Sequence, residues 1–239
     1  MPSRPRDAAN RTADPQRVAA VPGEDPADRR TEIATLLEFA TSRLSSDPAS
    51  AESALRRAAV LGSDVLPTDR LARLHSLIVT AVAAQPGRDL DLAAAAVRAA
   101  DSWQGLSVAD AAHHALVAAR THYRAGRHRE AAVLYRRALA HPDIPYPVAE
   151  IAILHEQFGG CLQAMHRYRA AAREFTTGAR LVAADADCGE LHADLLASAA
   201  AARAGATPGA VLRRMTAGVR RRVRGWWSVA HGGSRPRTP

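Results

Sequence analysis

Cys161 stands between His155 and His166 in the sequence, and a thiol beside an imidazole is the pairing that activates a nucleophilic cysteine. Residues that share a helix face are three or four positions apart, whereas these histidines lie six and five positions away. The only other cysteine is Cys188, so the chain has neither a disulfide framework nor the ligand set of a structural zinc site. We therefore expect Cys161 to be a small buried residue of a helix rather than a nucleophile.

The other potentially reactive residues do not form a catalytic or metal-binding motif. Adjacent His113 and His114 would point about 100° apart on a helix, and His155-Glu156 lacks the second histidine of the zinc-protease motif. All 32 basic residues are arginine, which excludes a Schiff-base lysine and the lysine of a phosphate-binding loop. The sequence contains neither a glycine-rich dinucleotide motif nor Gly-x-Ser-x-Gly. We expect no catalytic residue, no metal and no cofactor, and hence a protein that is not an enzyme.

The positive charge is concentrated at the C-terminal end of the chain. The formal net charge is +8, and nine arginines but no acidic residue lie between Arg203 and Pro239. A helix ending in tryptophan, with arginine opposite an apolar face, is typical of segments that lie in an anionic membrane interface. Nucleic acid and an acidic protein are alternative ligands. The residues expected to contact such an anionic surface are Arg213, Arg214, Arg220, Arg221, Arg222, Arg224, Trp226 and Trp227. A further interpretation is that this helix caps the rest of the protein and its arginines face solvent.

The elements that would position these residues are all expected to be helices. Alanine supplies 55 of the 239 residues, and an alanine-rich chain with few β-branched runs favours helix. Asp25-Pro26 and Asp47-Pro48 each combine an N-cap with proline at the first helical position. Caps, stops and apolar periodicity predict helices at 26–44, 48–62, 68–84, 89–102, 107–125, 128–140, 147–166, 168–184, 189–204 and 208–229.

Composition divides the chain into four parts. Residues 1–25 hold four prolines and few apolar residues, so we expect a disordered arm. A helical repeat domain over 26–207, a basic amphipathic helix over 208–231 and a disordered tail over 232–239 follow. The sequence has no apolar signal-peptide core and no uncharged apolar stretch of about 18 residues. We expect a cytoplasmic protein, and the excess of Arg, Ala, Gly and Pro is typical of a bacterial genome rich in GC.

The helices repeat with a period near forty residues. Breaks within successive helix pairs fall at Ser46, Gly87, Gly126, His166 and Gly205, with spacings of 41, 39, 40 and 39 residues. Five residues after each break lie Ala51, Leu92, Ala131, Ala171 and Ala210, and twelve after lie Ala58, Ala99, Ala138, Gly178 and Ala217. In an all-helical chain, a period of this size is typical of stacked helical hairpins.

This pattern resembles the tetratricopeptide repeat. The best copy comprises Ala119, Tyr123, Gly126, Ala131, Tyr135 and Ala138, followed by Pro142, and the next comprises Gly159, Ala171, Phe175 and Gly178. The resemblance implies a right-handed α-solenoid of about five antiparallel hairpins, with units longer than the family's repeat of about 34 residues. Elongated units of this kind resemble the repeat domains of bacterial regulators, which implies a scaffold or regulatory protein that binds other proteins.

In the resembled family, the first helix of each hairpin lines a concave groove. The corresponding partner-groove residues here are His113, Leu116, Arg120, Tyr123, Arg124, Ile153, Glu156, Gln163, His192 and Arg203, together with Leu74, Leu77, Gln85, Gly160 and Leu195. Their mixed charge implies a partner protein or peptide segment, for example an acidic one. Self-association through unpaired hairpin faces is an alternative. The same alignment predicts a close helix crossing at Gly159, and it places Gly160 in the groove.

Overall fold

The computed structural model describes residues 25–141, 144 and 146–205. Within these ranges the regular secondary structure is helical throughout, which confirms the all-α prediction. The helices are α1 (Pro26–Arg43), α2 (Pro48–Gly62), α3 (Thr68–Ala83), α4 (Asp89–Trp103), α5 (Val108–Arg124), α6 (His128–Leu139), α7 (Val148–Ala164), α8 (Tyr168–Leu181) and α9 (Gly189–Arg203), with a short 3-10 helix, η1 (Ala186–Cys188), before α9. The predicted helix over 208–229 and most of the predicted arm lie outside the described residues.

Helices α1, α2 and α5 each begin after a residue whose side chain caps the first turn. The Asp25 carboxylate accepts a hydrogen bond from the amide of Ala27 at 2.9 Å, and that of Asp47 accepts one from Ser50 at 3.1 Å. Each bond satisfies an amide that the first turn of a helix leaves unpaired. The boundaries of α1 to α9 agree with the predicted ones to within about three residues. The short helix η1 was not predicted.

Four of the five predicted breaks adopt the left-handed backbone conformation that ends a helix. Gly87, Gly126 and Gly205 have φ of 79°, 71° and 64°, and glycine adopts these angles without a Cβ clash. His166 does so with a side chain, at φ 59°, a conformation that costs about 1–2 kcal/mol in residues other than glycine. The fifth break, at Ser46, has no positive φ, and the chain there turns directly into the Asp47 cap.

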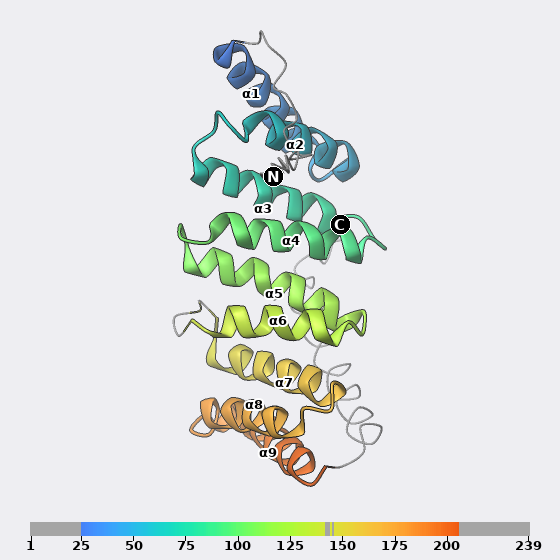
Figure 1. The fold of residues 1–239 in the computed structure, drawn as a ribbon, viewed down its shortest axis with the longest axis vertical. Helices are drawn as coiled ribbons and strands as arrows, with labels where there is room; N and C mark the ends of the chain where they lie inside the picture. The colour runs from blue at the N-terminus through green and yellow to red at the C-terminus, as the bar shows by residue number, and fades with distance from the viewer. Residues whose placement is uncertain (1–24, 142–143, 145, 206–239) are drawn as a thin grey trace, which may run out of the picture.

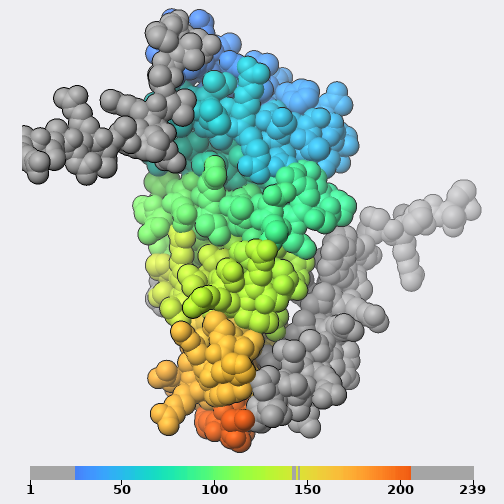
Figure 2. All heavy atoms as spheres, turned by 45° about the vertical axis from the view of Figure 1, so that its right-hand side comes forward, coloured from blue at the N-terminus to red at the C-terminus, as the bar shows by residue number. Residues whose placement is uncertain are grey.

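Each helix from α1 to α9 packs chiefly against the next one along the chain, among the residues that the structure describes. Figure 1 shows the helices following one another along the long axis, with α1 at one end and α9 at the other. On the surface the same order runs from the blue end to the orange end (Figure 2). The fold is thus helical-repeat-like, and among the described helices α1 packs chiefly against α2. None of the described helices is long and apolar enough to cross a membrane.

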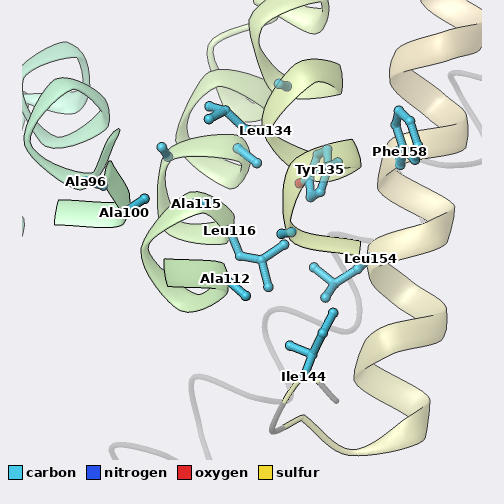
Figure 3. Packing of buried hydrophobic residues seen from close by; sticks show 14 of the residues in the cluster. Ala96, Ala100, Ala112, Ala115, Leu116, Leu134, Tyr135, Ile144, Leu154 and Phe158 are labelled. Carbon is cyan, nitrogen blue, oxygen red and sulfur yellow. The ribbon is translucent and has the colours of Figure 1, made fainter. Parts of the chain in front are cut away.

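The core combines many alanines with a few large side chains. Tyr135 and Phe175 are the largest fully buried residues, and both occupy the aromatic position of the predicted repeat. Small neighbours allow the helices to approach closely enough to enclose these rings. In Figure 3, Leu116 of α5, Leu154 of α7 and Ile144 lie close together, and all three are buried. Ile144, which lies between α6 and α7, therefore also contributes to the core.

The close crossing predicted at Gly159 is present. A Cβ atom added to Gly159 would lie 2.6 Å from Cε1 and 2.8 Å from Cδ1 of Phe175 on α8. Gly178 of α8 makes a similar approach in return, because a Cβ there would lie 3.0 Å from the carbonyl oxygen of Ala152 on α7. Gly160 is also buried, although the alignment with the resembled family placed it in a groove.

Candidate partner-binding groove

The thiol of Cys161 is poorly suited to nucleophilic chemistry. Its side chain is fully buried, and burial raises the pKa of the thiol to about 12, so the sulfur is protonated at neutral pH. His155 instead pairs with Glu174 on α8, with 3.0 Å between Nδ1 and the carboxylate oxygen. The prediction that Cys161 is a buried packing residue is confirmed. Within the described ranges, no three His, Cys, Asp or Glu side chains are grouped closely enough to hold a metal ion.

The predicted groove residues of α5 are mostly engaged in contacts within the chain. The Arg120 guanidinium donates to the carboxylate of Glu150 on α7 at 2.5 Å. Nδ1 of His113 lies 2.7 Å from the hydroxyl of Tyr146, and the two rings stack with 6.4 Å between centroids. The side chain of Arg124 is 67% exposed. Of these three predicted residues, Arg124 is the one that presents most of its charge to solvent.

The other two predicted residues of α5 belong to the interior. Leu116 is fully buried and lies near Leu154 of α7 (Figure 3), so its side chain offers no surface to a partner. Tyr123 is half-buried, and its ring centroid lies 6.5 Å from that of Tyr135. Burial raises the pKa of Tyr123 to about 12, with smaller contributions from Cys161 and Glu156. Both side chains therefore stabilise the fold at the positions where a groove was expected.

The predicted groove face of α7 is more enclosed than expected. Ile153 is half-buried, and Glu156 and Gln163 are only 8% and 4% exposed. The side-chain nitrogen and oxygen of Gln163 find no hydrogen-bond partner among the described residues, which is uncommon for a buried amide.

The predicted groove residues of α9 are also partly enclosed. Leu195 is buried, His192 is half-buried, and the guanidinium of Arg203 donates to Thr176 at 2.8 Å.

The predicted Arg120 of α5 thus pairs with Glu150 of α7, which the alignment did not name, and the predicted Glu156 contributes to the raised pKa of Tyr123. Those of α9 lie further along the stack (Figure 1). Much of the surface between α5 and α7 is closed by these internal contacts. The grooves that open to solvent lie at other helices.

Such a site lies between α1 and α3, where a groove of about 590 Å³ opens to solvent. Its lining includes two of the predicted residues, Leu74 and Leu77. The remaining apolar lining comes from the facing helix and from the connection between α2 and α3: Ile33, Ala34, Leu37, Val65, Leu66 and Pro67. Ile33 and Leu74 are each 2% exposed and form its floor, whereas Leu37 and Leu77 are half-buried and remain accessible.

Three arginines, Arg30, Arg70 and Arg73, complete the lining of this α1–α3 groove. Arg73 lies 4.0 Å from Asp69, and both of these side chains are more than half exposed, so their ion pair is weak. Arg30 and Arg70 have no ion pair or hydrogen bond with any described residue. The groove therefore combines an apolar floor with a positively charged rim.

Sequence reasoning named Leu74 and Leu77 but not the arginines. Arg30, Ile33, Ala34 and Leu37 of α1 lie 40 residues before Arg70, Arg73, Leu74 and Leu77 of α3. Each set follows the spacing i, i+3, i+4 and i+7, which places its members on one helix face. Applying the repeat period to the first helix would therefore have predicted that these α1 residues line a groove with their α3 counterparts. We call each set a stripe.

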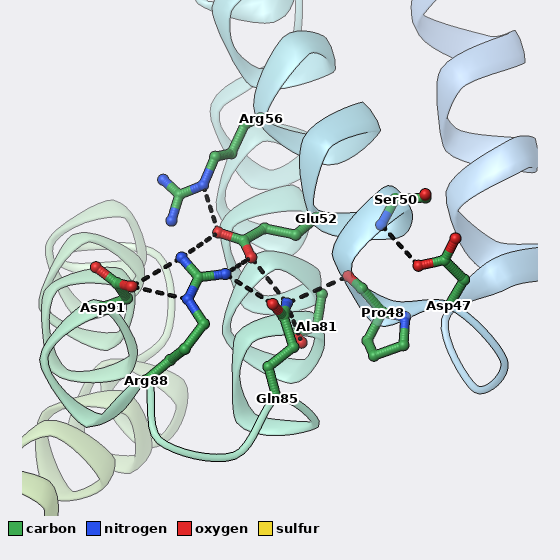
Figure 4. Close-up of polar contacts among 9 residues, drawn as sticks. All are labelled: Asp47, Pro48, Ser50, Glu52, Arg56, Ala81, Gln85, Arg88 and Asp91. Carbon is green, nitrogen blue, oxygen red and sulfur yellow. Dashed lines mark hydrogen bonds and ion pairs between the residues drawn. The ribbon is translucent and has the colours of Figure 1, made fainter.

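Gln85, a further predicted groove residue, belongs to a polar network instead (Figure 4). Its amide nitrogen donates to Glu52 of α2 at 2.8 Å, and its amide oxygen accepts from Arg88 at 2.8 Å. Arg88 also donates to Glu52, and Arg56 donates to it at 2.8 Å. Burial raises the pKa of Glu52, but hydrogen bonds from these three residues outweigh burial and keep the pKa below its usual value. The network joins α2 to the turn between α3 and α4.

A second groove, of about 660 Å³, lies among α2, α3 and α4. Its lining includes Arg56 and Asp91, which already pair with Glu52 and Arg88. Arg98, also in this lining, is exposed and has no ion pair with a described residue, so this groove has one unpaired arginine where the α1–α3 groove has two.

The residues predicted to contact an anionic surface, from Arg213 to Trp227, lie outside the described part of the chain. In comparisons with known proteins, no protein-family model matches the sequence, and no curated protein matches it significantly.

Proposed function

We propose that this chain is a non-enzymatic helical-repeat module, of a scaffold or regulatory kind, that binds a segment of a partner protein. In this proposal the stacked helices α1 to α9 form tetratricopeptide-like antiparallel hairpins of a right-handed solenoid. The sequential packing of α1 to α9 and the left-handed breaks at the predicted positions support this arrangement. We propose a bacterial cytoplasm as its location.

The observation that carries the proposal is the open α1–α3 groove. Helices of a soluble protein normally bury a stripe of leucine and isoleucine against a neighbour, yet Leu37 and Leu77 remain accessible there. A groove between two helices with an apolar floor and a few charged groups at its rim is a common site for a peptide or helix of another protein.

Site-specific photo-crosslinking tests this function. A photoreactive amino acid replaces Leu77 in the full chain, and in a control chain it replaces Val133, which is 58% exposed on α6. We expect discrete protein adducts from position 77 in native lysate, few from position 133, and loss of the adducts when Ala34→Trp fills the groove. Equal adducts from both positions, or adducts that Ala34→Trp does not reduce, would contradict binding in this groove.

The rival function is docking on an anionic membrane or nucleic acid through the C-terminal arginines and tryptophans. The absence of acidic residues among 206–239 favours it, because contacts to polyanions are electrostatic and salt-dependent. A full chain in which the six arginines from Arg213 to Arg224 are changed to Gln provides the comparison. Binding to anionic vesicles or duplex DNA that weakens steeply with salt, and is lost in this variant, would support the rival.

Self-association is a further form of the proposed protein binding. Light scattering of the purified full chain, with and without Ala34→Trp, tests whether a second copy occupies the groove. A dimer that dissociates with Ala34→Trp would identify the partner as another copy of this chain.

A further inference from the structure

An aromatic side chain lies beside the junction of α3 with α5 and another beside the junction of α5 with α7, whereas residues 182–188 before α9 include none. Trp103, the last residue of α4, donates through its indole nitrogen to the hydroxyl of Ser76 on α3 at 2.8 Å. The same hydroxyl lies 2.7 Å from Nε2 of His114 on α5, so Trp103 lies close to the junction of α3 and α5. Just before α7, the ring of Tyr146 stacks on the ring of His113 of α5, and its hydroxyl forms a hydrogen bond with Nδ1 of His113.

The corresponding connection between α2 and α3 provides no aromatic ring. Residues 63–67 read Ser-Asp-Val-Leu-Pro, and Val65, Leu66 and Pro67 line the α1–α3 groove without filling it. The groove volume of about 590 Å³ falls within the range of small-ligand pockets, about 300–1,000 Å³, so one aromatic side chain can enter it. A partner's aromatic side chain in this groove would bury the surface that Leu37 and Leu77 leave accessible.

The positive charge at the rim of the α1–α3 groove favours a ligand with acidic residues. Arg30, Arg70 and Arg73 would repel a basic segment, and planar guanidinium groups bind carboxylates well. The chain's own ends are poor candidates as occupants. Residues 206–239 contain eight arginines and no acidic residue, and residues 1–24 contain four arginines, three acidic residues and no aromatic residue.

We infer that the α1–α3 groove binds a partner segment with one aromatic anchor flanked by Asp or Glu. The ring enters between Leu37 and Leu77, and the carboxylates pair with Arg30 and Arg70. The matched stripes on α1 and α3 each extend over two helical turns, or about 10 Å, which suits one anchor and its flanking residues. This inference rests on the proposed function, because it specifies the chemistry of the segment that the module binds.

A random-peptide display library tests this chemistry. The library is selected on the full chain and depleted on the Ala34→Trp variant, so that surviving peptides depend on the groove. We expect an enrichment of one aromatic residue with neighbouring Asp and Glu. Groove-dependent peptides that are neutral or basic would overturn the inference and leave the proposed function standing. Failure to recover any groove-dependent peptide would overturn both.

Charge-reversal variants test the role of the arginines with the enriched peptide as probe. We expect the double variant Arg30→Glu and Arg70→Glu to weaken binding at least about tenfold, because each attraction becomes a repulsion. The control is Arg136→Glu on α6, which is exposed and makes no ion pair with a described residue, and which should leave the affinity unchanged. Equal affinities for the double variant and the wild type would refute the charge pairing.

Ala34→Trp also needs a control for bulk. Ala34 is exposed, so tryptophan there should occupy the groove without disturbing the core, and the melting temperature should stay close to that of the wild type. Ala197→Trp, at an exposed position of α9, adds the same side chain far from the groove. Binding that survives Ala34→Trp, or that Ala197→Trp weakens equally, would argue against the α1–α3 groove.

Discussion

Gly159 provides the sharpest test of the packing between α7 and α8. In an open helix, changing glycine to alanine stabilises the protein by about 1 kcal/mol through backbone entropy and helix propensity. Here the new Cβ would lie 2.6–2.9 Å from three atoms of the Phe175 ring. Because this ring is fully buried, it has little room to move. We expect overpacking of about 1–3 kcal/mol to outweigh the propensity gain, so that Gly159→Ala is destabilising or at best neutral.

Gly159→Leu should show the effect more clearly. It adds a larger side chain at the same contact, and we expect a loss of about 2–3 kcal/mol, which lowers the melting temperature by about 4–12 °C for a protein of this size. Calorimetry or circular dichroism melting measures the change. The control is Gly189→Ala at the start of α9, where a Cβ would meet no atom within 4 Å, and which should leave the melting temperature unchanged or raise it.

A double-mutant cycle connects the loss to Phe175. Phe175→Leu alone should destabilise the protein by leaving a cavity, but it should also relieve part of the clash made by Gly159→Ala. The two changes should therefore be less destabilising together than the sum of their separate effects, by about 0.5–1 kcal/mol or more. If Gly159→Ala stabilises the protein as much as Gly189→Ala does, the close crossing and the repeat alignment of this unit are wrong.

Three other properties follow from buried groups. Burial lowers the pKa of His114 to about 4, below the unfolded value of about 6.5, so the stabilising contribution of neutral His114 is complete above pH 6.5 and declines as the pH falls toward 4. Urea unfolding at pH 7 and 4.5 should show a loss of at most about 3 kcal/mol, and His114→Gln should reduce this pH dependence. Glu52→Gln should lower the free energy of unfolding, measured with denaturant, by about 2–3 kcal/mol, because it disrupts a buried ionic network. Glu32→Gln breaks an exposed pair and should lower it by less than about 1 kcal/mol. Cys161 should resist a thiol reagent in the native state and react on unfolding, whereas half-buried Cys188 should react faster; equal native rates would show that the fold opens at α7.

The helices and their breaks were predictable because their signals are local. Asp-Pro caps, glycine stops and small residues at fixed spacings act within a few positions of the chain, and α2 was predicted with the same boundaries that the structure shows. The close crossing at Gly159 was also predictable, because a glycine inside a long helix carries a propensity cost that tight packing explains. The short helix η1 lacks a comparable signal, since its three residues follow an isolated cap at Asp185.

Exposure of the groove residues was less predictable, because it depends on which connection lies over each helix. His113 is exposed on α5 as predicted, but Tyr146, from a connection 33 residues later, stacks on its ring and engages its Nδ1 atom. Gln85 could have faced a groove, yet Glu52 and Arg88 engage its amide. These contacts join segments far apart in sequence, so a repeat alignment does not contain them.

The connection beside the α1–α3 groove differs from those before α5 and α7. Later in the array, Trp103 and Tyr146 bond to neighbouring helices, and an aromatic contact of this kind contributes to stability while it closes the surface. In the first unit, the connection leaves Leu37 and Leu77 accessible. The fold therefore lacks part of the stabilisation that complete burial of these side chains would provide. Because α1 is the first described helix and its main packing partner is α2, a ligand in the groove would bridge α1 directly to α3. Binding there should therefore stabilise the end of the array as well as recruit the partner.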